Sequence, residues 1–97
     1  MKESEFRAVS LCQALGSTTR YRILRLLSSR RLKPSELCRE LGKSASVISV
    51  HLAKLRANGL VRFKRESDGL VYWHKPKGLA ALMQRIEKVA TSLPTGT

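Results

Sequence analysis

Residues 34–75 constrain the fold of this 97-residue chain more than any other segment. Pro34 suits the first position of a helix, because the N–H that it lacks would be unpaired there. Gly42 ends this first helical pattern, and Ser44 is a good N-cap for a second one that continues to Asn58. Residues 34–58 therefore predict a helix-turn-helix, in which a tight turn projects the second helix outward.

A β-hairpin is predicted directly after the second helix. Residues 61–65 and 70–75 have the composition of strands, and Asp68 and Gly69 between them form a strong hairpin signal because such a turn needs positive φ. The hairpin residues that we expect to cover the core are Val61, Phe63, Val71 and Trp73. Residues 61–75 then form a wing beside the helix-turn-helix.

Three more helices are predicted outside this segment. Apolar residues recur at helical spacing in residues 4–15, 17–29 and 77–92, and residues 93–97 are expected to be a frayed tail. The residues of the second, third and fourth helices that we expect to face inward are Ile23, Leu24, Leu27, Leu37, Leu41, Ile48, Leu52 and Leu55. The chain is thus predicted to be one winged-helix domain, residues 1–97, mainly α with a small β-hairpin between the fourth and fifth helices.

The charge of the chain predicts a polyanionic partner. Nineteen Lys and Arg residues against seven Asp and Glu residues give a formal net charge of +12. The basic segments also carry the apolar spacing of core packing, which favours nucleic acid over a membrane surface. No segment approaches the roughly 20 apolar residues that span a bilayer, and the N-terminal residues lack the pattern of a secretory signal. We therefore expect a cytoplasmic protein that binds double-stranded DNA and no membrane.

Several short segments, taken in order, resemble the arsenic-repressor (ArsR) family of small winged-helix transcriptional regulators. The matching segments are residues 14–24, 36–37, 41–42, 46–49, 51–52, 55–61 and 71–73. The match covers nearly the whole chain with almost no insertions. The resemblance implies a five-helix winged domain that dimerises through its first and last helices and represses transcription by occupying operator DNA.

The metal sites of that family are not matched. Where the family has a pair of cysteines flanking one residue, this chain has Lys33, Pro34 and Ser35, none of which is a soft ligand. In the last helix Glu87 is the only group of the family's ligand types, and one carboxylate cannot build a tetrahedral site. We therefore predict no metal and no other cofactor, and the sequence names no effector.

Outward side chains of the 44–58 helix and of the hairpin are the candidate DNA contacts. Serine hydroxyls can bond to a phosphate or a base edge, and small apolar groups can contact a thymine methyl group. For His51 the resemblance implies a phosphate or base contact, and packing against the wing is the alternative. The candidates are Ser44, Ala45, Ser46, Ser49, Val50, His51, Lys54, Arg62, Lys64 and Arg65. A solvated helix face, and basic strand residues that discourage aggregation, are the alternatives for the others.

An apolar stripe on the first and last helices predicts a homodimer. A small domain gains core by pairing, although in a monomer the stripe could pack on the body. The dimerisation candidates are Ala8, Leu11 and Cys12 in helix 1–15, and Leu79, Leu82, Met83, Ile86 and Val89 in helix 77–92. Cys12 and Cys38 do not form a disulfide framework. They are either small core residues, which we prefer, or redox-active thiols.

No residue pattern of the chain suggests catalysis, since it has no Ser-His-Asp arrangement, glycine-rich phosphate loop or carboxylate cluster. We expect a homodimeric, sequence-specific DNA-binding regulator, most simply a repressor on a palindromic operator. The alternative is a winged-helix module whose basic surface contacts RNA, non-specific DNA or protein.

Overall fold

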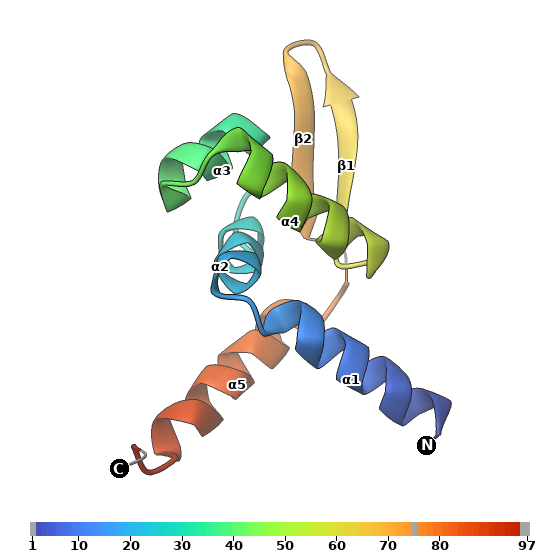
Figure 1. The fold of residues 1–97 in the computed structure, drawn as a ribbon, viewed down its shortest axis with the longest axis vertical. Helices are drawn as coiled ribbons and strands as arrows, with labels where there is room; N and C mark the ends of the chain where they lie inside the picture. The colour runs from blue at the N-terminus through green and yellow to red at the C-terminus, as the bar shows by residue number, and fades with distance from the viewer. Residues whose placement is uncertain (1, 75, 96–97) are drawn as a thin grey trace.

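The computed structural model describes residues 2–74 and 76–95. Within them, helices and strands follow in the predicted order (Figure 1): α1 Glu3–Leu15, α2 Thr18–Leu27, α3 Pro34–Leu41, α4 Ala45–Ala57, β1 Val61–Glu66, β2 Gly69–His74 and α5 Leu79–Ser92. The α2 helix lies in the middle, the β1–β2 wing projects at one end, and α1 and α5 diverge at the other. The predicted winged helix-turn-helix is confirmed.

Local capping explains where α2, α3 and α4 begin and where α3 ends. The hydroxyls of Ser17 and Ser44 accept backbone N–H bonds at 3.2 and 3.3 Å, as the sequence predicts for the starts of α2 and α4. At the start of α3, Glu36 Oε1 accepts from the backbone N of Lys33 at 2.8 Å and so compensates for a residue that cannot cap. Gly42 ends α3 in the left-handed conformation, with φ 65°.

One predicted boundary of α2 and one of α5 are wrong by two residues, β1 and β2 each extend one residue further toward the turn than predicted, and two predictions fall outside the described residues. The α2 helix ends at Leu27 instead of residue 29. The α5 helix begins at Leu79 instead of residue 77, because Gly78 before it has a φ of 82° and cannot continue a helix backwards. Residue 75 of the second predicted strand and residues 96–97 of the predicted tail are not described. Residues 93–95 lie outside any helix or strand.

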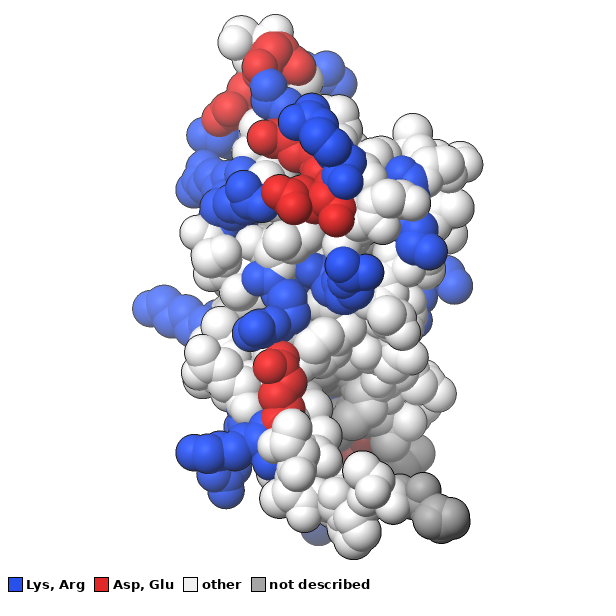
Figure 2. All heavy atoms as spheres, turned by 90° about the vertical axis from the view of Figure 1, so that its left-hand side faces the viewer, with Lys and Arg blue, Asp and Glu red and all other residues white. Residues whose placement is uncertain are grey.

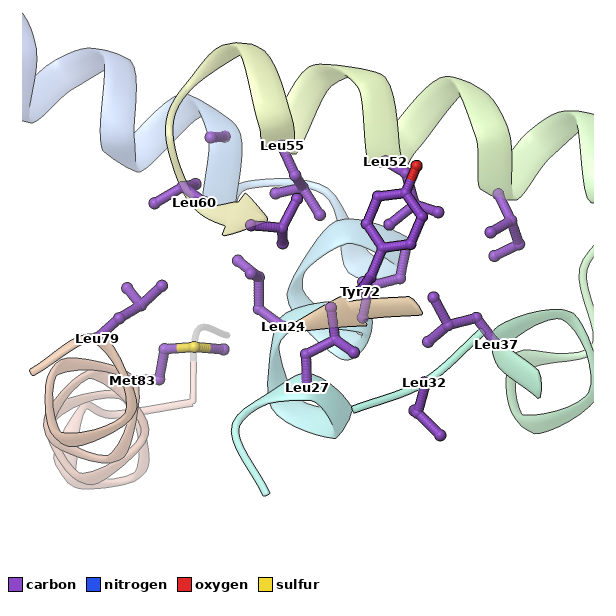
Figure 3. Close-up of a cluster of buried hydrophobic side chains, with 14 residues drawn as sticks. Leu24, Leu27, Leu32, Leu37, Leu52, Leu55, Leu60, Tyr72, Leu79 and Met83 are labelled. Atoms are coloured by element: carbon purple, nitrogen blue, oxygen red, sulfur yellow. The ribbon is translucent and has the colours of Figure 1, made fainter. Parts of the chain in front are cut away.

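The hydrophobic core joins all the helices to the hairpin (Figure 3). Of the residues predicted to face inward from α2, α3 and α4, all are buried except Leu41, which is half-buried. Val61 and Val71, predicted as core residues of the hairpin, are also buried. The other buried apolar residues are Ala14, Leu32, Leu60, Tyr72, Leu79 and Met83. None of the described helices is long and apolar enough to cross a bilayer.

The hairpin register overturns part of the predicted core. Phe63 pairs with Tyr72, and Lys64 pairs with Val71. Cross-strand partners lie on the same face, so Tyr72, and not Trp73, accompanies Phe63 toward the body. Tyr72 is 6% exposed, whereas Phe63 is 38% exposed and stacks on the Tyr72 ring at 5.3 Å between centroids. The prediction that Phe63 and Trp73 are core residues is therefore wrong.

Candidate nucleic-acid interface

The outer side of α4 is open to solvent along its N-terminal half. Ile48, Leu52 and Leu55 hold the inner side of α4 in the core. The predicted outward residues Ala45, Ser46, Ser49, Val50 and Lys54 are all exposed. Val50 shows 56% of its surface, a large fraction for a β-branched apolar residue. This exposed row has the shape and chemistry that a helix needs to enter a major groove.

The wing carries three exposed basic side chains. Arg62, Lys64 and Arg65 lie on β1, where alternation places Arg62 and Lys64 on one face and Arg65 on the other. Lys64 Nζ also lies 3.3 Å from Glu66 Oε2, so its charge is partly neutralised. Both faces of the wing therefore present a cation that can reach a phosphate.

A cation–π contact connects α4 to the wing. The guanidinium of Arg56, near the end of α4, lies 5.0 Å from the centre of the Phe63 ring on β1. Arg56 is not among the residues that the sequence predicts for this site. The contact links the C-terminal end of α4 to β1.

The loop between α2 and α3 braces the wing from its other side. Leu32 exchanges two backbone hydrogen bonds with Tyr72, of 2.8 and 3.0 Å. The Arg31 guanidinium stacks over the Trp73 ring at 4.5 Å. Lys33 forms an ion pair with Asp68 at the wing tip; their hydrogen bond raises the pKa of Lys33 and lowers the pKa of Asp68. None of these contacts was predicted, because no local signal links positions so far apart in the chain.

His51 lies at the edge of the open side of α4 and is half-buried. Its Nδ1 atom is 3.3 Å from Nη1 of Arg20 on α2. Burial, and then the positive charges of Arg20, Lys54 and Lys43, lower the pKa of His51. A histidine in this setting is neutral at pH 7, and its ring is oriented by a neighbour.

Figure 2 shows the charge on the side of the molecule that lies at the left in Figure 1. Basic side chains are spread from the upper part of this face to its lower left edge, and acidic side chains lie between them, mostly in the upper part. On this face the positive charge is thus spread over several parts of the surface. An extended anion such as DNA would meet it along several elements.

At the positions that correspond to the metal site of the ArsR family, this chain has side chains that are poor metal ligands. Lys33 is engaged with Asp68, and Pro34 has no donor group. Among the described residues no cluster of three or more His, Cys, Asp or Glu side chains could hold a metal ion. Both cysteines are free thiols, with Cys38 half-buried on α3 and Cys12 exposed on α1. The interpretation of Cys12 as a core residue of this chain is wrong, and the redox interpretation stays a prediction.

A second exposed surface lies on α1 and α5, away from the wing. The exposed large apolar residues of this surface are Phe6 and Val9 on α1, Leu82, Ile86 and Val89 on α5, and Leu93 just after it. Two of the predicted dimerisation residues, Leu79 and Met83, are instead buried in the core of this chain. Of the other candidates, Ala8 and Cys12 are exposed and Leu11 is half-buried.

The comparisons with known proteins agree with this arrangement. Residues 17–62 match the family described as bacterial regulatory protein, arsR family. The transcriptional activator HlyU of Vibrio cholerae is 30% identical over 89 residues, which are 92% of this chain and 82% of that protein. The HTH-type transcriptional regulator YgaV of Escherichia coli is 32% identical over 90 residues, which are 92% of this chain and 91% of that protein.

Solved structures show the same fold. HlyU from Vibrio cholerae superposes with a TM-score of 0.83 over 94% of this chain and 99% of that chain, at 30% identity. A homodimeric winged helix-turn-helix DNA-binding domain from Mycobacterium bovis superposes with a TM-score of 0.81 over 95% of this chain and 89% of that chain, at 22% identity. The family and these relatives are regulators and not enzymes. This chain therefore belongs to the arsR family of bacterial regulatory proteins and is a DNA-binding transcriptional regulator.

Proposed function

We propose that this protein is a homodimeric repressor that binds a palindromic operator through α4 and the β1–β2 wing. The observation that carries the proposal is the open outer side of α4, where Ser46, Ser49 and Val50 are exposed while the opposite side is anchored in the core. Repression needs only that the operator be occupied. Such a regulator acts in the cytoplasm, where bacterial DNA lies.

In this proposal α4 reads the bases mainly through small side chains. Ser46 and Ser49 would bond to base edges or phosphates, and Ala45 and Val50 would contact thymine methyl groups. None of these four can form the bidentate bond that an Arg or Asn makes to a purine. Sequence preference would therefore depend strongly on methyl contacts and on the deformability of the operator.

The wing would supply phosphate contacts. Arg62, Lys64 and Arg65 are exposed, and the loop between α2 and α3 holds the hairpin in place. Each neutralised phosphate releases counterions, so log affinity should fall with log salt by about 0.9 per contact. Phosphate contacts fix the register of the protein on the duplex, and α4 then selects the sequence.

The apolar faces of α1 and α5 support pairing with a second copy. Phe6 and Val9 on α1, and Ile86 and Val89 on α5, leave large apolar side chains exposed on both helices, and pairing with a second copy would cover them. A two-fold dimer would use the same surface on both copies. It would present two α4 helices to half-sites about 34–36 Å apart, one turn of the duplex.

A binding assay with the full chain tests the proposal. Purified protein is titrated into the duplex upstream of its own gene and into a shuffled duplex of equal length, at physiological salt. We expect one dimer on a palindrome and a preference of at least about 1,000-fold over the shuffled duplex. Equal affinity for both duplexes and for RNA would contradict the proposal and favour a module that binds nucleic acid through charge alone.

A further inference from the structure

The side chain of Arg20 contacts two other helices at once. Its Nε donates to the carbonyl oxygen of Ala14 at 2.8 Å, and its Nη2 donates to that of Gln13 at 3.1 Å. These carbonyls belong to the last turn of α1, and that of Gln13 also accepts from the backbone N–H of Gly16 at 3.2 Å. The remaining nitrogen, Nη1, lies 3.3 Å from Nδ1 of His51 on α4. One guanidinium therefore connects the end of α1 to the helix that faces DNA.

This contact determines which nitrogen of His51 carries the proton. A guanidinium has donors and no acceptor, so Nδ1 of His51 must accept the bond from Arg20. A neutral imidazole that accepts at Nδ1 carries its proton on Nε2. In the described part of the chain, Nε2 of His51 makes no hydrogen bond and is not among the buried unpaired atoms. The Nε2–H group is therefore a donor available to a ligand at the surface.

The surroundings of His51 favour an anionic ligand. The charged groups that face it are Arg20 from α2, Lys54 from α4 and Lys43 from the preceding turn, and all three are positive. Burial, and then these positive charges, lower the pKa of His51 and so disfavour its protonated form. A cleft of about 190 Å³ beside this contact has no acidic side chain, and its lining is Ser10, Gln13, Ala14, Arg20, Lys54 and Asn58.

We propose that Arg20 is a positioning residue that holds His51 as the neutral Nε2–H tautomer, so that His51 donates a hydrogen bond to a phosphate oxygen of bound DNA. The proposal rests on the DNA interface proposed above, and it adds the donor atom and the residue that orients it. It also accounts for a half-buried histidine in a group of positive charges, where a protonated ring would be repelled by Arg20.

The first test reads the tautomer directly in the free protein. The chain has two histidines, so ¹⁵N-labelled protein with a His74→Gln variant assigns the His51 signals by NMR. We expect the proton on Nε2 in the unaltered protein. In Arg20→Met, which removes both donor and charge, we expect both tautomers and a pKa of His51 closer to its ordinary value. A proton on Nδ1, or a tautomer population unchanged by Arg20→Met, would overturn the proposal.

The second test measures DNA affinity at fixed salt in a double-mutant cycle. Arg20→Met and His51→Leu are each expected to weaken duplex binding about tenfold, the effect of one hydrogen bond to a charged group. The double variant should be no weaker than either single variant, because both remove the same bond. Additive losses would show that Arg20 acts by another route and would overturn the proposal.

Two further variants separate this role from folding. Arg20→Met also removes the bonds to the α1 carbonyls, so the folding of this variant is checked by circular dichroism. Arg20→Lys, which keeps the charge but not the planar fork, is measured in parallel. The amide of His51→Gln can accept at one atom and donate at the other, and this variant should lose less affinity than His51→Leu. An equal loss in both His51 variants would contradict the proposal.

The outcomes also distinguish this inference from the proposed function. Absence of duplex preference in the unaltered protein would overturn the DNA interface itself. Specific duplex binding with an unchanged His51 tautomer in Arg20→Met would overturn only the role of Arg20.

Discussion

The hydroxyl of Tyr21 on α2 donates a hydrogen bond of 2.7 Å to Oε2 of Glu87 on α5. The same hydroxyl lies 3.2 Å from the carbonyl oxygen of Met83, and Arg25 Nε lies 3.4 Å from the Glu87 carboxylate. Burial and the bond to Glu87 raise the pKa of Tyr21. Together with the buried side chains of Leu79 and Met83, this polar cluster holds α5 to the body of the described chain.

Replacing Tyr21 by Phe should lower the free energy of unfolding by about 1–2 kcal/mol, because the Glu87 carboxylate loses its shortest hydrogen bond. Chemical denaturation followed by circular dichroism measures the change. Tyr72→Phe is the matched control, since the Tyr72 hydroxyl has no hydrogen-bond partner among the described residues, and it should change stability by less than about 0.5 kcal/mol. Equal effects in the two variants would contradict the role of the Tyr21 bond.

Truncation of Ile48 should be far more damaging than truncation of its neighbour Val47. Ile48 is fully buried on the inner side of α4, whereas Val47 is 38% exposed. Ile48→Ala should lower the free energy of unfolding by about 2–5 kcal/mol, because it removes buried methyl groups and leaves a cavity. Val47→Ala should cost about 0.5 kcal/mol. Similar costs, measured by urea denaturation, would show that the two sides of α4 are assigned incorrectly.

Arg65→Ala should reduce the salt dependence of DNA binding. Loss of one phosphate contact should lower the slope of log affinity against log salt by about 0.9 and weaken all duplexes equally. Fluorescence anisotropy at a series of salt concentrations gives the slope. Arg85→Ala on α5 is the matched control, because Arg85 is exposed and lies on a helix far from the wing. An equal change of the salt slope in Arg85→Ala and Arg65→Ala would contradict a DNA contact made by the wing.

Ile86→Asp should separate the proposed dimer into monomers. Ile86 exposes 38% of its surface on the apolar face of α5, where a carboxylate would be buried without a partner on pairing. Analytical ultracentrifugation should show the monomer, and affinity for a palindrome should fall to that of a half-site. Gln84→Asp places the same charge at another exposed position of α5 and should leave the mass unchanged. A monomeric unaltered protein would refute the dimer.

Acidification should destabilise the folded protein partly through His74. Burial lowers the pKa of His74, and its Nε2 atom is buried without a hydrogen-bond partner. The unfolded chain therefore binds more protons than the folded chain below about pH 6.5, and stability must rise with pH through that window. Above about pH 6.5 the ring of His74 is neutral in both states and does not lower the free energy of unfolding. This free energy falls as the pH drops from there through the lowered pKa of the folded protein.

His74→Gln should flatten the dependence of unfolding free energy on pH below about 6.5. Urea denaturation at several pH values measures this slope in both proteins. A variant as sensitive to pH as the unaltered protein would assign the effect to other groups.

Much of the fold could be predicted because its signals are local. Ser17 and Ser44 mark helix starts through bonds within one turn, Pro34 marks one because it lacks the N–H that would be unpaired there, and the apolar spacing of α2 and α4 identifies their buried sides. The exposed candidates on α4 follow from the same periodicity, since a residue opposite a buried stripe faces outward. Whether they contact DNA stays a prediction that the binding experiments address.

Tertiary structure alone decided the features that depend on register and on distant partners. A shift of one residue in the pairing of β1 with β2 exchanges the two faces of the hairpin, so Tyr72 replaced Trp73 in the core. Arg20 meets His51 across 31 positions, and Tyr21 meets Glu87 across 66. Residues within about four positions of one another determine caps and turns, but contacts at these separations exist only after the helices have packed. Local sequence therefore determined the elements and their inner sides, and packing decided which side chains meet between them.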